Sequence, residues 1–409
     1  MKIISASWIV TCDENSTIIK DGAIVYENKI IDIGDLESIK EKYPNIEIVK
    51  LKENSVIIPG LINSHVHLEF SSNTTTLKYG NFISWLNSVI SSRDELIEKA
   101  NTKLISQKLS RMKKTGTTTI GAISSYSFDL EACKKSPINT VFFTEVIGSK
   151  ADMADTLFAD FKARLNSAIL EKNEKFIPAV AIHSPYSVHP FLIRESLKLA
   201  IESNLAVSSH FLESPEEFEW LHKDEGGFLD FFKNFLGQEK SVTRPMEFLN
   251  QFKNIKNLSF THCVEASNND LQKIKELGAT INHCVTSNRF LNNTKLDLNR
   301  LEEYAIPFSI GTDGLSSNNS LSMFDELRNL LMMHSNKNIV NFSKDLLKAA
   351  TINGSDALGL NKGELITNKD ADLICISLPD TVKDENDLCM NIILHTKSVD
   401  KTIIGGKDV

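Results

Sequence analysis

Two histidines spaced two residues apart, His65 and His67, form the most specific chemical signal in the sequence. In a β-strand, side chains at positions i and i+2 point to the same face, so both imidazoles can reach one metal ion. The alternative is a surface strand with two exposed histidines. The preceding segment Pro59–Ile62, followed by Asn63 and Ser64, favours a strand that ends in metal ligands.

Further along the chain, other residues offer the groups that a metal-dependent hydrolase needs. His210 supplies a third imidazole and Glu213 follows it, although a buried histidine and a helix-capping glutamate are the alternative. Asp313 offers a carboxylate ligand, but Asp-Gly is also a common turn pair. We interpret His262 as a proton shuttle rather than a satisfied core histidine, because it accompanies this cluster.

These polar residues follow short apolar runs that read as strands. The runs are Val56–Ile58, Thr117–Ile120, Val141–Phe143, Ala179–Ile182, Ala206–Ser208, Leu258–Phe260, Ala279–Ile281 and Phe308–Ile310. Between them lie stretches of helical periodicity, such as Phe191–Glu202 and Asn269–Leu277. Eight such runs predict an α/β fold, a closed (β/α)₈ TIM-like barrel with its chemistry at the strand ends. The strand-end histidines are His65, His67, His183, His210, His262 and His283.

The two chain ends have a different pattern. Short runs rich in Ile and Val, broken by turn residues, occupy Ile3–Thr11, Gly22–Glu27, Lys29–Ile33, Ile46–Leu51, Ala371–Ile376 and Ser398–Ile404. Strands of this density at both termini predict one small β unit made from the two ends. We therefore expect a β-sandwich from residues 1–57 and 363–409, and a hydrolase barrel from residues 58–362.

Composition limits the partners and the compartment. The net charge is -8, with lysine and arginine spread along the chain, which argues against a nucleic-acid backbone as partner. The six cysteines form no Cys-x-x-Cys pair and are interpreted as free thiols of a cytoplasmic protein. We find no signal peptide and no segment long enough to cross a bilayer, so no membrane association is expected.

Taken together, the motifs resemble the amidohydrolase superfamily, over nearly the whole chain. More narrowly, they are similar to its branch of cytosine, guanine, adenosine-derivative and triazine hydrolases. The matching segments are Pro59–His67, His210 with Glu213, His262, Gly311–Asp313, Ala350–Gly354 and Ala371–Leu373.

The resemblance implies a single divalent metal ion, either zinc or iron(II), since both suit a site of nitrogen and oxygen ligands. Binuclear relatives use a carboxylated lysine at the end of the fourth strand, whereas Ala179–Ile182 is followed here by His183. The implied ligands are His65, His67, His210 and Asp313.

The same resemblance implies roles in hydrolytic deamination. A water activated at the metal attacks the amidine carbon of the ring, and Asp313 takes its proton. A protonated Glu213 donates to the ring nitrogen, and His262 orients the water or the departing ammonia. Two carboxylates with opposite duties need different pKa values, and metal ligation of Asp313 would separate them.

For the substrate, the resemblance points to an adenosine derivative. Segments around Glu69 and Trp85 are similar to the aminofutalosine deaminases, which convert 6-amino-6-deoxyfutalosine to futalosine and ammonia in menaquinone biosynthesis. The segment that begins at His183 resembles one that touches the ribose in nucleoside-processing relatives, although Ser-Pro also favours a plain turn. We expect these three residues to bind a nucleoside-like substrate. Arg93 or Arg289 is a candidate for a substrate carboxylate, with a solvated surface arginine as the alternative.

Several other functions stay open at this point. The same machinery serves deaminases of methylthioadenosine, S-adenosylhomocysteine or guanine, and triazine hydrolases that displace chloride. A non-catalytic barrel acting as a binding module is the alternative from another class, although such proteins typically lose ligands that are all present here. The Pro-Cys-x-x-Cys signature of base-flipping zinc deaminases is absent. A homodimer is the default expectation for assembly.

Overall fold

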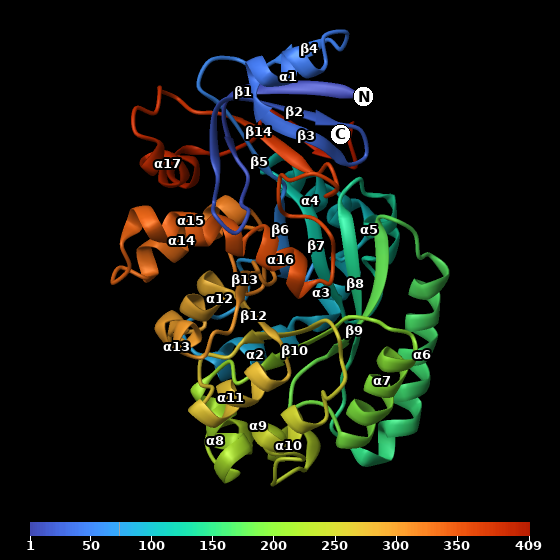
Figure 1. The fold of residues 1–409 in the computed structure, drawn as a ribbon. Coiled ribbons are helices and arrows are strands. Elements are labelled where there is room, and N and C mark those ends of the chain that lie inside the picture. Colours follow the sequence, from blue (N-terminus) through green and yellow to red (C-terminus); the bar gives the residue numbers. More distant parts are fainter. Residues whose placement is uncertain (73) are drawn as a thin grey trace.

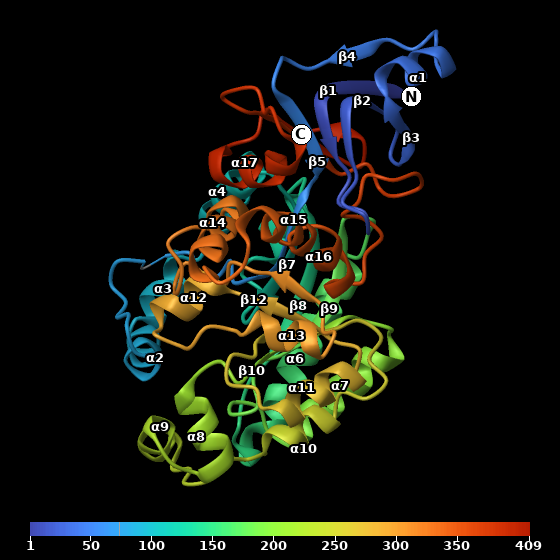
Figure 2. The same cartoon turned by 60° about the vertical axis from the view of Figure 1, so that its left-hand side comes forward.

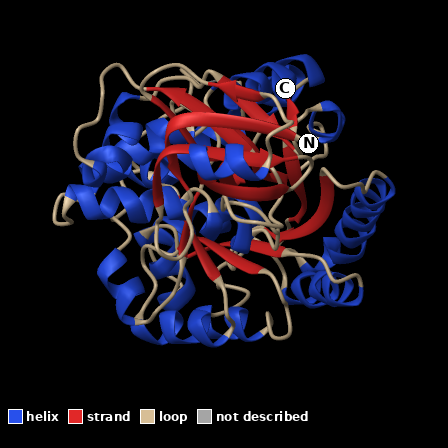
Figure 3. Ribbon diagram, turned by 45° about the horizontal axis from the view of Figure 1, so that its top comes forward, coloured by secondary structure: helices blue, strands red, loops and turns tan. Residues whose placement is uncertain are grey.

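The computed structural model describes residues 1–72 and 74–409, in which the strands form two separate eight-stranded sheets (Figure 1). One sheet is built from both ends of the chain. The other consists of parallel strands enclosed by a layer of helices (Figure 3). This arrangement confirms the predicted barrel and the predicted β unit made from the two termini.

The terminal sheet joins strands from the first and last parts of the sequence. Its order is β16-β15-β14-β5-β1-β2-β3, and β4 pairs with β1 beside β5. Hydrogen bonds therefore link the strands into one continuous sheet. The strands are β1 Lys2–Val10, β2 Ile18–Tyr26, β3 Ile30–Asp35, β4 Ile48–Lys50, β5 Ser55–Pro59, β14 Leu373–Ser377, β15 Lys401–Ile404 and β16 Lys407–Asp408.

The barrel sheet follows the order of the chain, and each strand is parallel to the next. Its strands are β6 Leu61–Val66, β7 Thr117–Ser124, β8 Asn139–Val146, β9 Phe176–Ile182, β10 Val207–Phe211, β11 Leu258–His262, β12 Thr280–His283 and β13 Phe308–Ile310. The ring closes between β13 and β6. There the Asn63 amide and Thr312 bond reciprocally, and the Asp313 N–H donates to the His65 carbonyl oxygen at 3.1 Å.

Helices cover the outside of the barrel because each one has a single apolar face. In α6, the buried Phe161, Leu165 and Ala168 lie three or four residues apart. The predicted helices at 191–202 and 269–277 are confirmed. The barrel helices are α4 Thr102–Lys114, α5 Leu130–Lys135, α6 Ala154–Leu170, α7 Pro190–Glu202, α10 Pro245–Asn250, α11 Asn268–Glu276, α12 Val285–Phe290, α13 Leu298–Glu303, α14 Met323–Met333, α15 Ile339–Ala349 and α16 Ile352–Ala357.

Two longer connections carry additional helices. After β6 the chain forms α2 Phe82–Ser91 and α3 Arg93–Lys99, and after β10 it forms α8 Pro215–Lys223 and α9 Gly227–Leu236. These helices lie on one side of the molecule (Figure 2), and the rings of Phe82 and Phe228 are 5.8 Å apart. The remaining helices are α1 Leu36–Lys42, α17 Leu388–His395, and the 3₁₀ turns η1 Ala151–Met153 and η2 Glu385–Asp387.

One predicted barrel strand was wrong. The run Val56–Ile58 lies in β5, which pairs with β1 and β14 of the terminal sheet. The barrel begins with β6, so the domain boundary expected between residues 57 and 58 falls inside β5. A single residue, Gly60, separates β5 from β6, and both strands are wholly buried. In the sequence, β5 and β6 therefore resemble a single strand, with His65 and His67 as the polar residues that follow it.

The link from β5 to β6 also orients the barrel. The terminal sheet lies next to the ends at which the barrel strands begin, and the ends at which they stop point away from it (Figure 1). The long helical connections emerge at that far end. Across the described residues, no helix is long and apolar enough to span a membrane. The six cysteines are buried and free.

Candidate active site

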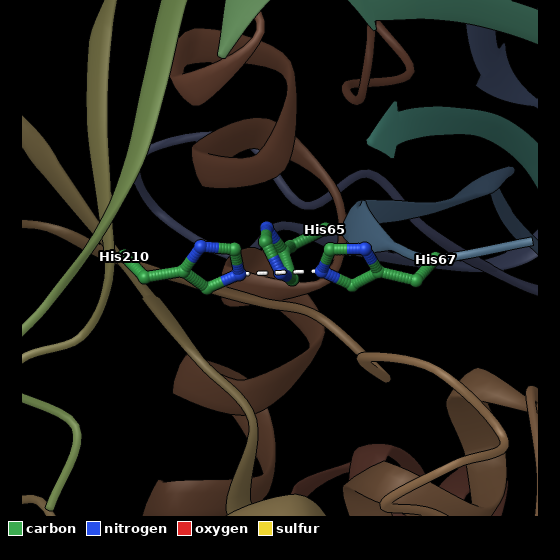
Figure 4. Close-up of side chains that lie close together, drawn as sticks. All are labelled: His65, His67 and His210. Atoms are coloured by element: carbon green, nitrogen blue, oxygen red, sulfur yellow. Dashed lines mark hydrogen bonds between the residues drawn. The ribbon is translucent and has the colours of Figure 1, made fainter. Parts of the chain in front are cut away.

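The far ends of the barrel strands bring the predicted metal ligands together. His65 lies near the end of β6, His67 just beyond it, His210 in β10, and Asp313 three residues after β13. The Nε2 atoms of His67 and His210 are 3.2 Å apart. Oδ1 of Asp313 lies 3.6 Å from Nε2 of His67 and 3.9 Å from Nε2 of His65. Figure 4 shows the three imidazoles around one point.

The donor atoms of this cluster fit a divalent metal ion. Nδ1 of His210 lies 2.7 Å from the His183 carbonyl oxygen, so it carries the hydrogen and leaves a lone pair on Nε2. Nδ1 of His65 faces the Thr261 hydroxyl at 3.1 Å. Its Nε2 is buried and has no hydrogen-bond partner among the residues described. Three imidazole nitrogens and a carboxylate oxygen form a set typical of zinc or iron(II) sites.

Asp313 is held in place by its own loop and by Ser287 of α12. A Cβ at Gly311 would lie 2.7 Å from Cβ of His65, so only glycine allows this close approach. Asp313 itself has a φ of 57°, a left-handed conformation that is uncommon outside glycine and is often found at functional sites. The hydroxyls of Ser287 and Ser317 donate to Oδ2 at 2.7 and 2.9 Å. Oδ1 is thereby left to face the histidines.

Next to the ligands lie the two predicted proton-transfer residues. Oε2 of Glu213 is 3.6 Å from Nε2 of His262, and both residues cluster with Asp313. Nδ1 of His262 lies 2.8 Å from Oδ1 of Asn288, which fixes the hydrogen on Nδ1 and the lone pair on Nε2. The backbone N–H groups of Leu212 and Glu213 donate to the Glu217 carboxylate, which secures the loop.

The two catalytic carboxyls have opposite pKa shifts. Burial, with the nearby charge of Asp313, raises the pKa of Glu213 well above its ordinary value. Burial alone would also raise the pKa of Asp313. The imidazoles of His67 and His262, among others, outweigh it and hold that pKa below the ordinary value. Burial therefore favours the protonated form of Glu213, and the histidines favour the ionised form of Asp313, which is the separation that acid and base roles need.

A cavity of about 450 Å³ opens beside this cluster. His67, His210, Glu213, His262 and Asp313 line its polar end, which also includes His183. The other end is mostly apolar and is lined from the additional helices by residues including Leu86, Val89 and Ile90 of α2 and Phe231, Phe235 and Leu236 of α9.

Two of the three predicted substrate-binding residues line this cavity. Trp85 lines it with its indole N–H donating to the Ser316 carbonyl oxygen at 2.8 Å. His183 lines it with Nδ1 next to the Ser187 hydroxyl, and burial lowers the His183 pKa to about 3, so the imidazole is neutral. Arg93 also lines the cavity, whereas Arg289 is exposed and lies outside the cavity lining.

The third of these residues, Glu69, lies behind the cavity wall. It is fully buried and is not among the described residues that line the cavity. Its carboxylate accepts hydrogen bonds from the backbone N–H groups of Ser125, Tyr126 and Phe128 at 2.7 to 3.0 Å. The side chain therefore holds the loop after β7 in place. Its place beside His67 in the sequence could not reveal this, because the partners are backbone groups of a distant loop.

We compared the chain with protein-family models, with curated proteins and with solved structures. The model of the amidohydrolase family matches residues 56–409, which is most of the chain. This protein belongs to the amidohydrolase family.

Two amidohydrolase relatives span essentially the full chain. The aminodeoxyfutalosine deaminase of a Nitratiruptor species is 45% identical over 100% of this chain and 99% of its own length. The adenosine deaminase of Helicobacter pylori is 37% identical over the same shares. Among solved structures, H. pylori aminofutalosine deaminase in complex with methylthio-coformycin superposes with a TM-score of 0.96 at 35% identity, covering 100% of both chains.

The amidohydrolase site also contains residues that the sequence reasoning missed. Glu145, at the end of β8, lines the cavity and accepts a hydrogen bond from the Ser125 hydroxyl at 2.5 Å. Glu217, Ser287 and Asn288 position the catalytic groups. Only Glu145 carried a usable signal, because it follows the apolar run Val141–Phe143 as the histidines follow theirs.

Proposed function

We propose that this chain is a metal-dependent deaminase that hydrolyses the 6-amino group of an adenosine derivative. The observation that carries the proposal is the convergence of Glu213, His262 and Asp313 beside the three clustered histidines. A protonated acid, an oriented imidazole and an ionised carboxylate, all within reach of one metal site, match the needs of hydrolysis at a ring amidine carbon.

The residues that would hold the metal are His65, His67, His210 and Asp313. The bound ion would be zinc or iron(II), and it would supply the activation of water by lowering its pKa towards roughly 7. Around it, Oδ1 of Asp313 faces the histidines while Oδ2 is held by two serine hydroxyls.

Three residues of the chain carry out or assist the proton transfers of the reaction. Glu213, protonated because of its burial, donates to the ring nitrogen next to the reacting carbon and stabilises the tetrahedral intermediate. Asp313, ionised, accepts the proton of the attacking water and delivers it to the departing ammonia. His262 presents the lone pair of Nε2 to the same space and orients the water and the leaving group.

As the substrate we propose 6-amino-6-deoxyfutalosine, converted to futalosine and ammonia in menaquinone biosynthesis. The name of the Nitratiruptor relative, at 45% identity over the full chain, supports this choice. The apolar end of the cavity supports it as well, because adenosine alone would leave those side chains uncovered. We assign Trp85 and His183 to the nucleoside part of the substrate.

A second candidate is deamination of adenosine or of a simple 5′-modified adenosine. It is favoured by the relative from H. pylori that is named an adenosine deaminase, at 37% identity. The two candidates share the reaction at C6 and differ in the group attached to the 5′ carbon. They are distinguished only by substrate preference.

The test is a deamination assay with metal-loaded protein, followed through the ultraviolet change from adenine to hypoxanthine. Substrates are 6-amino-6-deoxyfutalosine, 5′-methylthioadenosine and adenosine. We expect the highest kcat/KM with 6-amino-6-deoxyfutalosine. Equal or better turnover of adenosine would support the second candidate, and no turnover of any adenine nucleoside by metal-loaded protein would exclude both.

A further inference from the structure

Two positively charged side chains line the mostly apolar end of the cavity. Arg93, the first residue of α3, and Lys150, just before η1, come from different connections, and both belong to the cavity lining. Neither forms an ion pair within 4.0 Å with a carboxylate anywhere in residues 1–72 and 74–409. The lining residues that neighbour them in sequence are mostly apolar, and no other lysine or arginine among the described residues lines the cavity.

Arg93 is exposed, but an aromatic ring defines the position of its guanidinium. Its guanidinium lies over the ring of Tyr126, 5.2 Å from the ring centre, and Tyr126 also lines the cavity. A cation held over an aromatic face loses less conformational freedom when it binds an anion. The residues of α3 that face Arg93, at three and four positions further on, are the apolar Leu96 and Ile97, so the helix itself supplies no acidic partner. The guanidinium is therefore left available to a ligand.

The acidic side chains that line the cavity have partners other than Arg93 and Lys150. Glu213 and Asp313 belong to the metal end, and Glu145 follows the barrel wall at the end of β8. When the reacting ring of a substrate lies at the metal site, the group at the other end of the substrate lies at the apolar end of the cavity. An apolar wall that carries two unpaired cations is complementary to an anionic group on an apolar or aromatic arm, because the wall buries the arm while the cations neutralise the charge.

From these observations we propose that Arg93 and Lys150 form an anion subsite that selects substrates carrying a carboxylate on an apolar arm beyond the sugar. Arg93 supplies the planar, bidentate contact, and Lys150 adds a point charge. The inference rests on the proposed function, since it concerns the far end of the substrate that the metal site deaminates. It adds the feature that separates the proposed substrate from adenosine.

The experiment compares 6-amino-6-deoxyfutalosine with its methyl ester, which keeps the arm and removes the charge. For the wild-type enzyme we expect kcat/KM to favour the acid by about tenfold or more. Arg93→Gln is expected to lower kcat/KM for the acid by about tenfold, through KM, and to change the ester little. Lys150→Gln should also lower kcat/KM for the acid and leave that for the ester nearly unchanged, but by a smaller factor than Arg93→Gln. Added salt should raise the KM for the acid in both enzymes, and the rise should be larger for the wild type than for Arg93→Gln.

Arg289→Gln is the matched control, because Arg289 is an exposed arginine outside the cavity lining. It should leave the ratio of acid to ester unchanged. Equal wild-type rates with acid and ester, or an unchanged ratio in both Arg93→Gln and Lys150→Gln, would overturn the subsite and leave the deaminase standing. Failure of the wild-type enzyme to act on any adenine nucleoside would overturn the proposed function and the subsite together.

Discussion

The two ends of the cavity are built in different ways. The polar end consists of residues at the ends of barrel strands, whose backbones are fixed by the hydrogen bonds of the closed sheet. The apolar end consists of side chains from α2, α3 and α9, which belong to long connections outside the sheet. At the polar end His210, His262 and Asp313 have defined hydrogen-bond partners, while at the apolar end Phe235 is 59% exposed.

This difference separates the chemistry from the choice of substrate. A rigid sheet holds the acid, the base and the metal ligands within about 0.5 Å of the positions that catalysis requires. Helices in connecting segments can change in sequence and length without disturbing the sheet. We therefore expect changes at the polar end to abolish kcat, and changes at the apolar end to alter KM for one class of substrate.

The largest effect should follow loss of a metal ligand. His67→Ala removes a donor that lies 3.2 Å from His210 Nε2 and 3.6 Å from the Asp313 carboxylate. Without the ion, activity should fall on the order of 10⁴-fold or more, because water is no longer activated. We would measure the metal content of the variant by mass spectrometry, and its activity after zinc or iron(II) is added back. Wild-type protein stripped by a chelator should lose activity and regain it; full activity without metal would contradict the assignment.

Replacement of Glu213 should have the next largest effect. Glu213→Gln can still donate a hydrogen bond but cannot release a proton, so kcat should fall on the order of 10³-fold. Because burial raises the Glu213 pKa and so favours the acid form, wild-type activity should decline as pH rises through that pKa. The decline should disappear in Glu213→Gln. Glu219→Gln, a change to an exposed residue of the adjacent α8, should leave both rate and pH profile unaltered.

A smaller effect at the polar end should come from Asn288, which holds His262 without facing the substrate. Asn288→Ala removes the 2.8 Å contact that fixes the hydrogen of the imidazole on Nδ1. We expect kcat to fall by roughly 10- to 100-fold with KM and metal content unchanged. Steady-state kinetics measure this, with Asn341→Ala on the exposed face of α15 as control. A loss confined to thermal stability would assign Asn288 a structural role only.

The smallest effect should occur at the apolar end. Phe231→Ala removes a ring of α9 that lines the cavity, and KM for 6-amino-6-deoxyfutalosine should rise by roughly five- to tenfold through lost apolar contact. Turnover of adenosine should change little. Phe158→Ala, at a similarly half-buried site on α6 outside the cavity lining, should lower stability without this selectivity. Equal changes with both substrates would contradict the division between the two ends.

Two buried glutamates show where sequence reasoning reached its limit. Glu69 lies two residues beyond His67 and looked like a substrate ligand, yet three backbone N–H groups occupy its carboxylate. Burial nevertheless raises its pKa to about 7. Glu145 was overlooked, although it follows a strand and lines the cavity. The short distance in sequence from His67 to Glu69 did not show that Glu145, and not Glu69, lines the cavity. The partners of Glu69 come from the loop after β7, which is distant in the sequence.

The sequence by itself determined the barrel, the β unit made from both chain ends and the positions of the candidate metal and proton-transfer residues. It could do so because these residues stand at strand ends, and the alternation of strands and helices places all such ends on one face. Only the tertiary structure decided that β5 belongs to the terminal sheet, that Arg93 rather than Arg289 reaches the cavity, and that α2 and α9 form its apolar wall. Those facts depend on contacts between segments far apart in the chain, and no local pattern of residues encodes them.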